Sequence, residues 1–339
     1  MPHDPDPIAV VPAAGRTPAG HRLPAATSGV LAVVVSAMLF AVNGTVSKVA
    51  MQSGLSPARL VELRSVGSAL VLVAAVLVVA PRARLPRGRE LAGLALLGVV
   101  GMAMVQWLYF VAISRLPVGL ALLVEFTAPV LVALWARFVL REQVKVRVWW
   151  ALAACLSGLT LVAQVGDGIR LDLLGLVAAA GAAVSLATYY LLGSRLVRRR
   201  DPLSTQAWSM AFAGAFWVVL QPPWTFDATV LVDDVARPGV LAGAHLPLWA
   251  LVAWIVALGT VVPYVLVLIG MARLGAARTG VLGMIEPVAA SAVAWLVLAE
   301  SMTAVQLLGG VVVLGGVALA ETARRQPSVA PAPDAVVSH

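Results

Sequence analysis

Two carboxylates stand inside long apolar stretches of this sequence, and a proline closely follows each of them. Glu125 begins the string Glu-Phe-Thr-Ala-Pro that ends at Pro129, and Glu286 directly precedes Pro287. A proline has no N–H, so in a helix it leaves the carbonyl four residues earlier without a partner. Pro129 thereby frees the carbonyl of Glu125 itself, and Pro287 frees that of Gly283. We expect each helix to kink there, with its carboxylate and freed carbonyl at the floor of a central cavity.

The chemistry open to these two groups is the binding of a proton or of an ammonium ion. An ionised carboxylate in a low-dielectric setting tends to take up a proton, which a cellular pH gradient can then load and unload. Because an ionisable side chain is costly inside an apolar stretch, it is by default a functional candidate. Glu125 and Glu286 are therefore the predicted proton-coupling residues. The alternative is a structural role, in which each carboxylate is paired with an interior arginine or amide.

Four further side chains lie deep within the apolar stretches and are predicted to line the same cavity from four different helices. They are Asn43, Trp107, Tyr189 and Tyr264. Together with the two carboxylates they form the predicted substrate-binding site. Core packing is the alternative for each aromatic residue, since periodicity cannot distinguish a cavity face from a packed face in an all-apolar helix.

Enzymatic chemistry has no evident place in this chain. The four histidines all lie outside the apolar stretches, at His3, His21, His245 and His339. No glycine-rich phosphate-binding loop with its lysine is present. We therefore expect no enzyme activity, no metal site and no cofactor. The single cysteine, Cys155, cannot form an intrachain disulfide and is expected to be a buried, inert thiol.

The elements that position these residues follow from composition. Hydrophobic residues make up 61% of the chain and charged residues 12%, whereas a soluble domain has about half and about a quarter. A membrane span needs about 20 apolar residues. Ten such spans are predicted in an all-α, polytopic membrane protein, at residues 28–50, 57–80, 91–113, 117–140, 148–165, 171–196, 203–220, 248–271, 276–298 and 303–319.

The chain also contains an internal duplication. A stretch of about sixty residues recurs without a gap at a constant offset of 158, pairing Gly101 with Gly259, Arg115 with Arg273, Pro129 with Pro287, Glu142 with Glu300 and Gly158 with Gly316. Each copy holds five predicted spans, and an odd number forces the second copy to enter the membrane from the opposite side. We therefore predict two inverted five-helix repeats, 28–165 and 166–321, between disordered tails at 1–27 and 322–339.

The distribution of positive charge predicts the orientation of this bundle. Most of the 24 Lys and Arg residues fall in the loops on the side of the two termini. Because cytoplasmic loops retain Lys and Arg, both termini are predicted to be cytoplasmic. The net charge of +8 is then explained by topology and contact with anionic lipid, and no nucleic-acid partner is expected. Arg59, Glu62 and Arg64, near the outer end of the second span, are interpreted as pairing with one another or reaching toward the interface.

These motifs resemble the EamA unit of the drug/metabolite transporter superfamily, over about residues 28–320. Leu-Pro-Val-Gly at 116–119, the Glu-Phe-Thr-Ala-Pro string, Pro263-Tyr264 and Glu286-Pro287 resemble the branch that exports threonine and homoserine. By this resemblance, positions typical of the branch are Lys48, Arg64, Glu125, Tyr189, Pro263, Tyr264, Glu286 and Glu300. Asn43 stands where that branch tends to carry Gln, and Trp107 where it carries Tyr. The resemblance implies ten helices, cytoplasmic termini and efflux of amino acids or similar small metabolites.

The predicted function is therefore proton-coupled export of small zwitterionic metabolites across a bacterial cytoplasmic membrane, by alternating access between the two halves. The predicted partners are a small-molecule substrate, protons and the lipid bilayer. The sequence leaves open whether the chain forms a homodimer. One alternative is a uniporter or a drug exporter, in which the carboxylates are structural and the aromatic residues bind flat cations. A membrane receptor or scaffold is disfavoured, because the sequence contains no soluble domain to pass on a signal.

Overall fold

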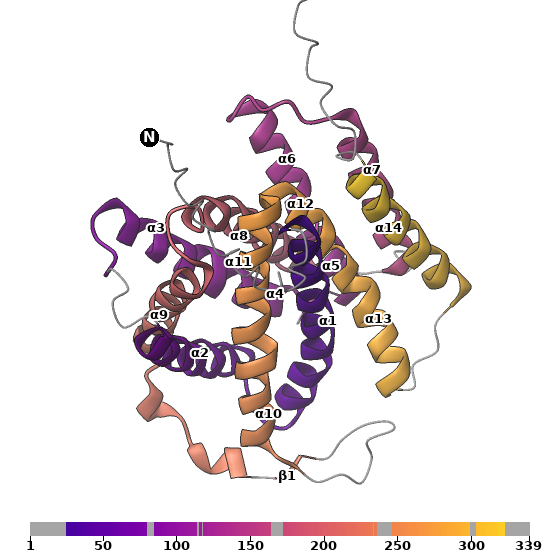
Figure 1. Ribbon diagram of the computed structural model, residues 1–339. Helices are drawn as coiled ribbons and strands as arrows, with labels where there is room; N and C mark the ends of the chain where they lie inside the picture. Colours follow the sequence, from indigo (N-terminus) through magenta and orange to yellow (C-terminus); the bar gives the residue numbers. More distant parts are fainter. Residues whose placement is uncertain are drawn as a thin grey trace, which may run out of the picture.

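The computed structural model describes residues 25–79, 85–113, 115–116, 118–163, 172–232, 234–235, 246–298 and 303–322. These residues form a helical bundle (Figure 1). The first half contains α1 (Ala25–Gln52), α2 (Pro57–Val79), α3 (Arg89–Gly98), the π-helical turn η1 (Val99–Met104), α4 (Val105–Ile113), α5 (Val118–Glu125), α6 (Ala128–Phe138) and α7 (Val146–Val162). Helix α1 begins at Ala25, inside the predicted tail 1–27, and the division of the chain into tails and repeats stays a prediction.

The second half follows the same order of helices, with a longer connection after its second helix. It contains α8 (Leu173–Leu196), α9 (Pro202–Leu220), α10 (Leu248–Val256), the π-helical turn η5 (Ala257–Val261), α11 (Val262–Leu274), α12 (Ala276–Gly283), α13 (Ile285–Leu298) and α14 (Ala304–Thr322). The connection between α9 and α10 holds two short 3-10 turns, η2 (Pro223–Thr225) and η3 (Ala228–Val232). It also holds the antiparallel pair β1 (Asp234–Val235) and β2 (Leu246–Pro247).

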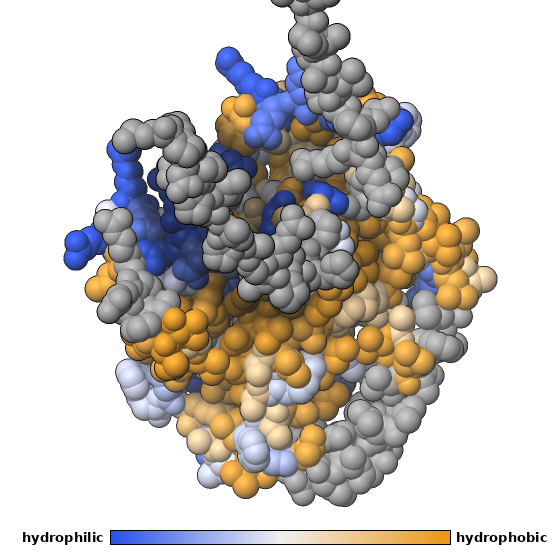
Figure 2. Space-filling model, viewed as in Figure 1, coloured by the Kyte–Doolittle hydropathy of each residue, from blue (hydrophilic) through white to orange (hydrophobic). Residues whose placement is uncertain are grey.

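Seven helical stretches in the described residues are long and apolar enough to cross a membrane. They are Ala25–Gln52, Pro57–Val79, Arg89–Ile113, Leu120–Phe138, Leu173–Leu196, Pro202–Leu220 and Leu248–Leu274. Two shorter apolar helices, Val146–Val162 and Ala304–Ala320, accompany them. Figure 2 shows hydrophobic residues across the middle of the molecule and strongly hydrophilic residues toward one end. The prediction of an all-helical membrane protein is confirmed, while the count of ten spans stays a prediction.

Local sequence sets several of the helix ends. At the start of α8, Asp172 accepts a hydrogen bond from the backbone N–H of Gly175 (2.7 Å). Asp201 does the same for Ser204 (2.8 Å) at the start of α9, where Pro202 is the first helical residue and needs no partner for its nitrogen. Such caps satisfy backbone donors that a helix start leaves free. Gly275, with φ of 83°, separates α11 from α12 in a conformation that disfavours other residues.

Two spans are interrupted just before the two prolines. In the first half, α5 ends at Glu125 and α6 begins at Ala128, one residue before Pro129. In the second half, α12 ends at Gly283 and α13 begins at Ile285, two residues before Pro287. Each carboxylate consequently lies beside a break in its helix, Glu125 on the near side of the break and Glu286 on the far side.

The two halves make reciprocal contacts through their first helices. A methyl group added to Gly29 in α1 would lie 2.9 Å from the side chain of Leu274 in α11, and one added to Gly175 in α8 would lie 2.7 Å from that of Leu116. Leu116 and Leu274 are separated by the repeat offset of 158. The π-helical turns η1 and η5 also begin at that offset, at Val99 and Ala257. The first helix of each half therefore packs against the third helix of the other.

Helix pairs from different halves form the two edges of the bundle. The pair α7 and α14 lies side by side at one edge, and α2 packs against α9 at the other (Figure 1). Large apolar side chains remain exposed on the outer faces of these helices, among them Val78, Trp150 and Val219. Such an exterior suits contact with lipid rather than water.

Candidate functional site

A cavity of about 630 Å³ lies at the centre of the bundle. Its walls come from both halves, including α1, α2, α4, α5, α8, α11 and α13. Five of the six predicted site residues line it, namely Asn43, Glu125, Tyr189, Tyr264 and Glu286. The volume is large enough for a small metabolite, since ligand pockets have volumes of roughly 300–1,000 Å³.

The two carboxylates reach this cavity from the two interrupted spans. Glu125 is the last residue of α5 and Glu286 the second residue of α13. They lie within electrostatic range of each other, and the hydroxyl groups of Tyr109 and Tyr190 lie within range of both. At the repeat offset, however, Glu125 aligns with Gly283, and Glu286 aligns with Ala128. The carboxylates are thus offset by almost one helical turn and are not symmetry equivalents.

In the second half, Gly283 corresponds to Glu125 and leaves room for a tyrosine. A methyl group added to Gly283 would lie 2.9 Å from the hydroxyl oxygen of Tyr190. Tyr190 in α8 corresponds to Gly44 in α1, at the offset of 146 that relates Gly29 to Gly175. No atom lies within 4 Å of a methyl group added to Gly44, which lines the cavity. The first half thus has a large residue at Glu125 and a small one at Gly44, whereas the second half has the small Gly283 and the large Tyr190 at the corresponding positions. The open volume therefore lies beside Gly44.

Arg64 also lines the cavity, although the sequence indicated pairing with its neighbours or a side chain that reaches toward the interface. Its Nε donates a hydrogen bond to the hydroxyl of Thr260 (3.2 Å), and its Nη2 donates to the carbonyl of Gly259 (3.2 Å). Both partners belong to the π-helical turn η5. The expected pair near the start of α2 forms without Arg64, because Arg59 binds Glu62. Only Arg64 of the three therefore faces the cavity.

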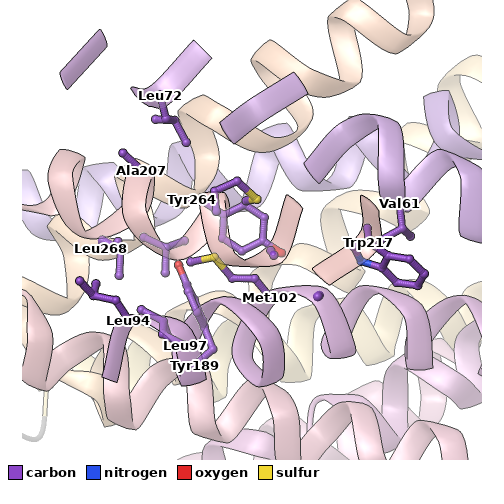
Figure 3. Packing of buried hydrophobic residues seen from close by; sticks show 14 of the residues in the cluster. Val61, Leu72, Leu94, Leu97, Met102, Tyr189, Ala207, Trp217, Tyr264 and Leu268 are labelled. Atoms are coloured by element: carbon purple, nitrogen blue, oxygen red, sulfur yellow. The ribbon is translucent and has the colours of Figure 1, made fainter. Parts of the chain in front are cut away.

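Aromatic side chains form much of the remaining wall. The rings of Tyr189 and Tyr264 meet edge to face, with centroids 5.6 Å apart and an interplanar angle of 89°, and Figure 3 shows both beside Met102. Phe40 contacts Tyr264 in the same manner at 5.1 Å. In α1, Asn43 lies directly against η5, where its amide oxygen contacts the position that a side chain at Gly259 would fill. These contacts bring residues from four helices to one surface.

Trp107 does not belong to this cavity, and its predicted place there is corrected. Its side chain is 38% exposed and contacts the ring of Trp217 in α9, with centroids 6.5 Å apart. Gln106 and Tyr109 line the cavity from the same helix. Two residues along an α-helix rotate the side chain by about 200°, so a helix that presents Tyr109 to the cavity must turn Trp107 away.

Some predicted residues have no described surroundings. The side chain of Lys48 and the whole of Glu300 lie outside the described residues, as do the tail segments 1–24 and 323–339. Within the described residues, no three His, Cys, Asp or Glu side chains gather to form a metal site. Cys155 is buried, and its thiol donates to the carbonyl of Val313 (3.6 Å).

A helical membrane bundle with interrupted spans around a central cavity that contains carboxylates is the architecture of a membrane transporter. Comparison with known proteins gives the family. The model of the EamA-like transporter family matches residues 27–164 and again 173–322. The chain belongs to this family, and the resemblance inferred from its motifs is confirmed.

Its relatives include bacterial transporters of modest similarity. The uncharacterized inner membrane transporter YicL of Salmonella typhimurium is 25% identical over 86% of this chain and 94% of the relative. The threonine/homoserine exporter RhtA of Escherichia coli is 27% identical over 68% of this chain and 72% of the relative. A solved crystal structure matches with a TM-score of 0.68 and 19% identity, over 88% of this chain and 98% of its own. That last likeness concerns the fold alone.

Proposed function

We propose that this protein is a proton-coupled exporter of small zwitterionic metabolites, most of all amino acids such as threonine or homoserine. The observation that carries the proposal is the presence of two half-buried carboxylates, Glu125 and Glu286, on one central cavity. The name of the exporter RhtA supports the substrate class. The proposed setting is the bacterial cytoplasmic membrane, and no enzymatic reaction is part of the proposal.

Coupling arises from competition for the carboxylates. A substrate ammonium group and a proton each neutralise a carboxylate in the cavity, and an unneutralised charge there is costly. The cavity therefore holds one or the other while it changes access from one side of the membrane to the other. Release of substrate outside then favours protonation, and return of the protonated site carries the proton inward. The result is antiport.

The proposed architecture for this exchange is ten spans in two inverted units, 28–165 and 166–321, with both termini in the cytoplasm. The reciprocal contacts of Gly29 and Gly175 support it. A further contact lies at the edge of the bundle, where Cys155 in α7 binds Val313 in α14. These two residues are separated by the repeat offset of 158, as expected where a pseudo-two-fold axis passes between equivalent helices.

The test is flux in liposomes containing the purified protein, with and without an imposed pH gradient. One pH unit corresponds to about 1.4 kcal/mol per proton, so one-for-one exchange should accumulate threonine about tenfold against its gradient. Glu125→Gln keeps the shape and hydrogen bonding of the side chain but cannot titrate, and it should abolish this accumulation. Glu286→Gln should do the same if the two carboxylates share the proton.

The matched control is Glu142→Gln, which removes an exposed carboxylate outside the cavity and should leave accumulation unchanged. Wild-type accumulation in both cavity variants would show that the carboxylates are structural. Downhill flux that ignores the pH gradient would favour a uniporter, and a complete absence of flux would favour a receptor or scaffold.

The aromatic wall favours a second candidate, an exporter of flat organic cations. Four tyrosines line the cavity, namely Tyr109, Tyr189, Tyr190 and Tyr264. Aromatic faces attract cations within about 6 Å, with energies of about 0.5–2 kcal/mol. A lipophilic aromatic cation that is transported in preference to threonine would establish this function instead.

A further inference from the structure

We propose that Arg64 binds the carboxylate of a transported α-amino acid, so that the cavity selects zwitterions over simple cations. The proposal rests on the proposed function, because it names the substrate group that this site recognises. Arg64 lies on α2, and its side chain is buried yet lines the cavity.

The guanidinium of Arg64 is held in one orientation by hydrogen bonds to the π-helical turn η5. In the π-helical turn η5, the hydroxyl of Thr260 donates to the carbonyl of Ile255 (2.8 Å) and accepts from Nε of Arg64 (3.2 Å). The carbonyl of Gly259 accepts from Nη2 (3.2 Å). Two donors of the planar group are thereby fixed. The third nitrogen, Nη1, makes no hydrogen bond to the described residues and is free to meet a ligand.

The charges of the cavity match a zwitterion better than a cation. Arg64 lies within electrostatic range of Glu286 but forms no ion pair with a described residue, whereas Glu125 lies within range of Glu286. An amino acid can place its ammonium group at a carboxylate and its carboxylate at the guanidinium. A simple amine leaves the buried guanidinium without an anionic partner, and a buried unpaired charge is strongly destabilising.

Among the described residues that line the cavity, an arginine comes from the first half only. Gly67 in α2 packs against Val256, and Phe212 in α9 packs against Gly98. Because Gly98 and Val256 are separated by the repeat offset of 158, Gly67 and Phe212 occupy corresponding places in the two halves. By this correspondence, the place of Arg64 is taken by Ser209 in the second half, which does not line the cavity. A cavity whose one arginine, among the described lining residues, comes from the first half would bind a zwitterion in one orientation.

The experiment measures how well two competitors inhibit exchange of labelled threonine in liposomes. The competitors are unlabelled threonine and 1-aminopropan-2-ol, which is threonine without its carboxylate. The wild type should prefer threonine by ten- to a hundredfold, the value expected for a hydrogen-bonded charge pair of about 1.5–3 kcal/mol. Arg64→Gln should remove most of this preference by weakening threonine while changing the amine by less than about threefold.

Two further variants separate recognition from a structural role. Arg64→Lys keeps the charge and should retain part of the preference. Thr260→Val releases Nε without removing the guanidinium and should give an intermediate preference, which keeps the proposal testable even if Arg64→Gln does not fold. The control is Arg115→Gln, an equal change of charge at an exposed arginine that pairs with Asp172 (3.3 Å), and it should keep the wild-type preference.

Several outcomes overturn the proposal. If Arg64→Gln weakens both competitors equally, Arg64 only supports η5. If Thr260→Val and Arg64→Lys both keep the full preference, the guanidinium is not the carboxylate receptor. A wild type that exchanges threonine but does not distinguish it from the amine refutes this inference and leaves the proposed function standing. A wild type that exchanges no amino acid refutes both.

Discussion

The packing of α7 against α14 predicts a large difference between two adjacent glycines. A methyl group added to Gly316 would lie 2.6 Å from Sγ of Cys155, 2.9 Å from the carbonyl oxygen of Ala151 and 3.0 Å from the backbone nitrogen of Cys155. Two of these three atoms belong to the backbone and cannot rotate away. Gly316→Ala must therefore push the two helices apart. Gly315→Ala is the matched control, because nothing lies within 4 Å of its added methyl group.

The magnitude follows from two opposing terms. Alanine is preferred over glycine in a helix by about 1 kcal/mol, and both variants gain this. Overpacking costs about 1–3 kcal/mol, and only Gly316→Ala carries this cost. Gly315→Ala should therefore stabilise the protein by up to about 1 kcal/mol. Gly316→Ala should be neutral or destabilising by up to about 2 kcal/mol, and the two variants should differ by about 1–3 kcal/mol.

The assay is reversible unfolding in mixed detergent micelles, in which a denaturing detergent is titrated and helix content is followed by circular dichroism. Both variants are measured in the same micelles, so that differences in the solvent cancel. Equal stability of the two variants would refute the close approach of α7 and α14. A less stable Gly315→Ala would refute the open space beside Gly315.

Three other measurements test separate parts of the structure. Cysteines placed beside Glu142 and Glu300 should react differently with an impermeant thiol reagent added outside the cell, with only the second labelled, and equal labelling would exclude the inverted repeat. Trp107→Phe should leave transport unchanged, because the side chain points away from the cavity, so a change in substrate affinity would return it to the site. Hydrogen bonds from the hydroxyl (2.6 Å) and backbone N–H (3.0 Å) of Thr229 hold the pKa of Asp227 below its usual value. The stabilisation of the folded state by these hydrogen bonds is present above the unfolded pKa of about 4. It is lost as the pH falls through the lowered pKa of the folded state. Thr229→Val should therefore raise the pKa of Asp227 that is measured in an NMR titration of labelled aspartate. An unchanged titration would contradict the role of the hydroxyl.

The features that the sequence predicts well are those set by local chemistry. An apolar stretch of sufficient length predicts a membrane helix, because the bilayer excludes unpaired backbone groups. The missing N–H of Pro129 and Pro287 indicates an interruption within a few residues, and the helices end at Glu125 and Gly283. The carboxylates were candidates for a similar reason, since a charge in an apolar stretch needs a partner wherever that stretch lies.

Tertiary structure decided which of the candidate side chains share the cavity and which further residues join them. Arg64 meets Gly259, a residue 195 positions away, and no pattern around either residue indicates the contact. Trp107 and Tyr109 stand in an apolar helix without an amphipathic period, so only its packing against α9 shows which of them faces inward. The sequence by itself determined the class of protein, the family and the helix breaks, because these depend on composition and backbone chemistry. The rotation of each helix and the place of the guanidinium depend on contacts between distant segments, and only the folded bundle determines them.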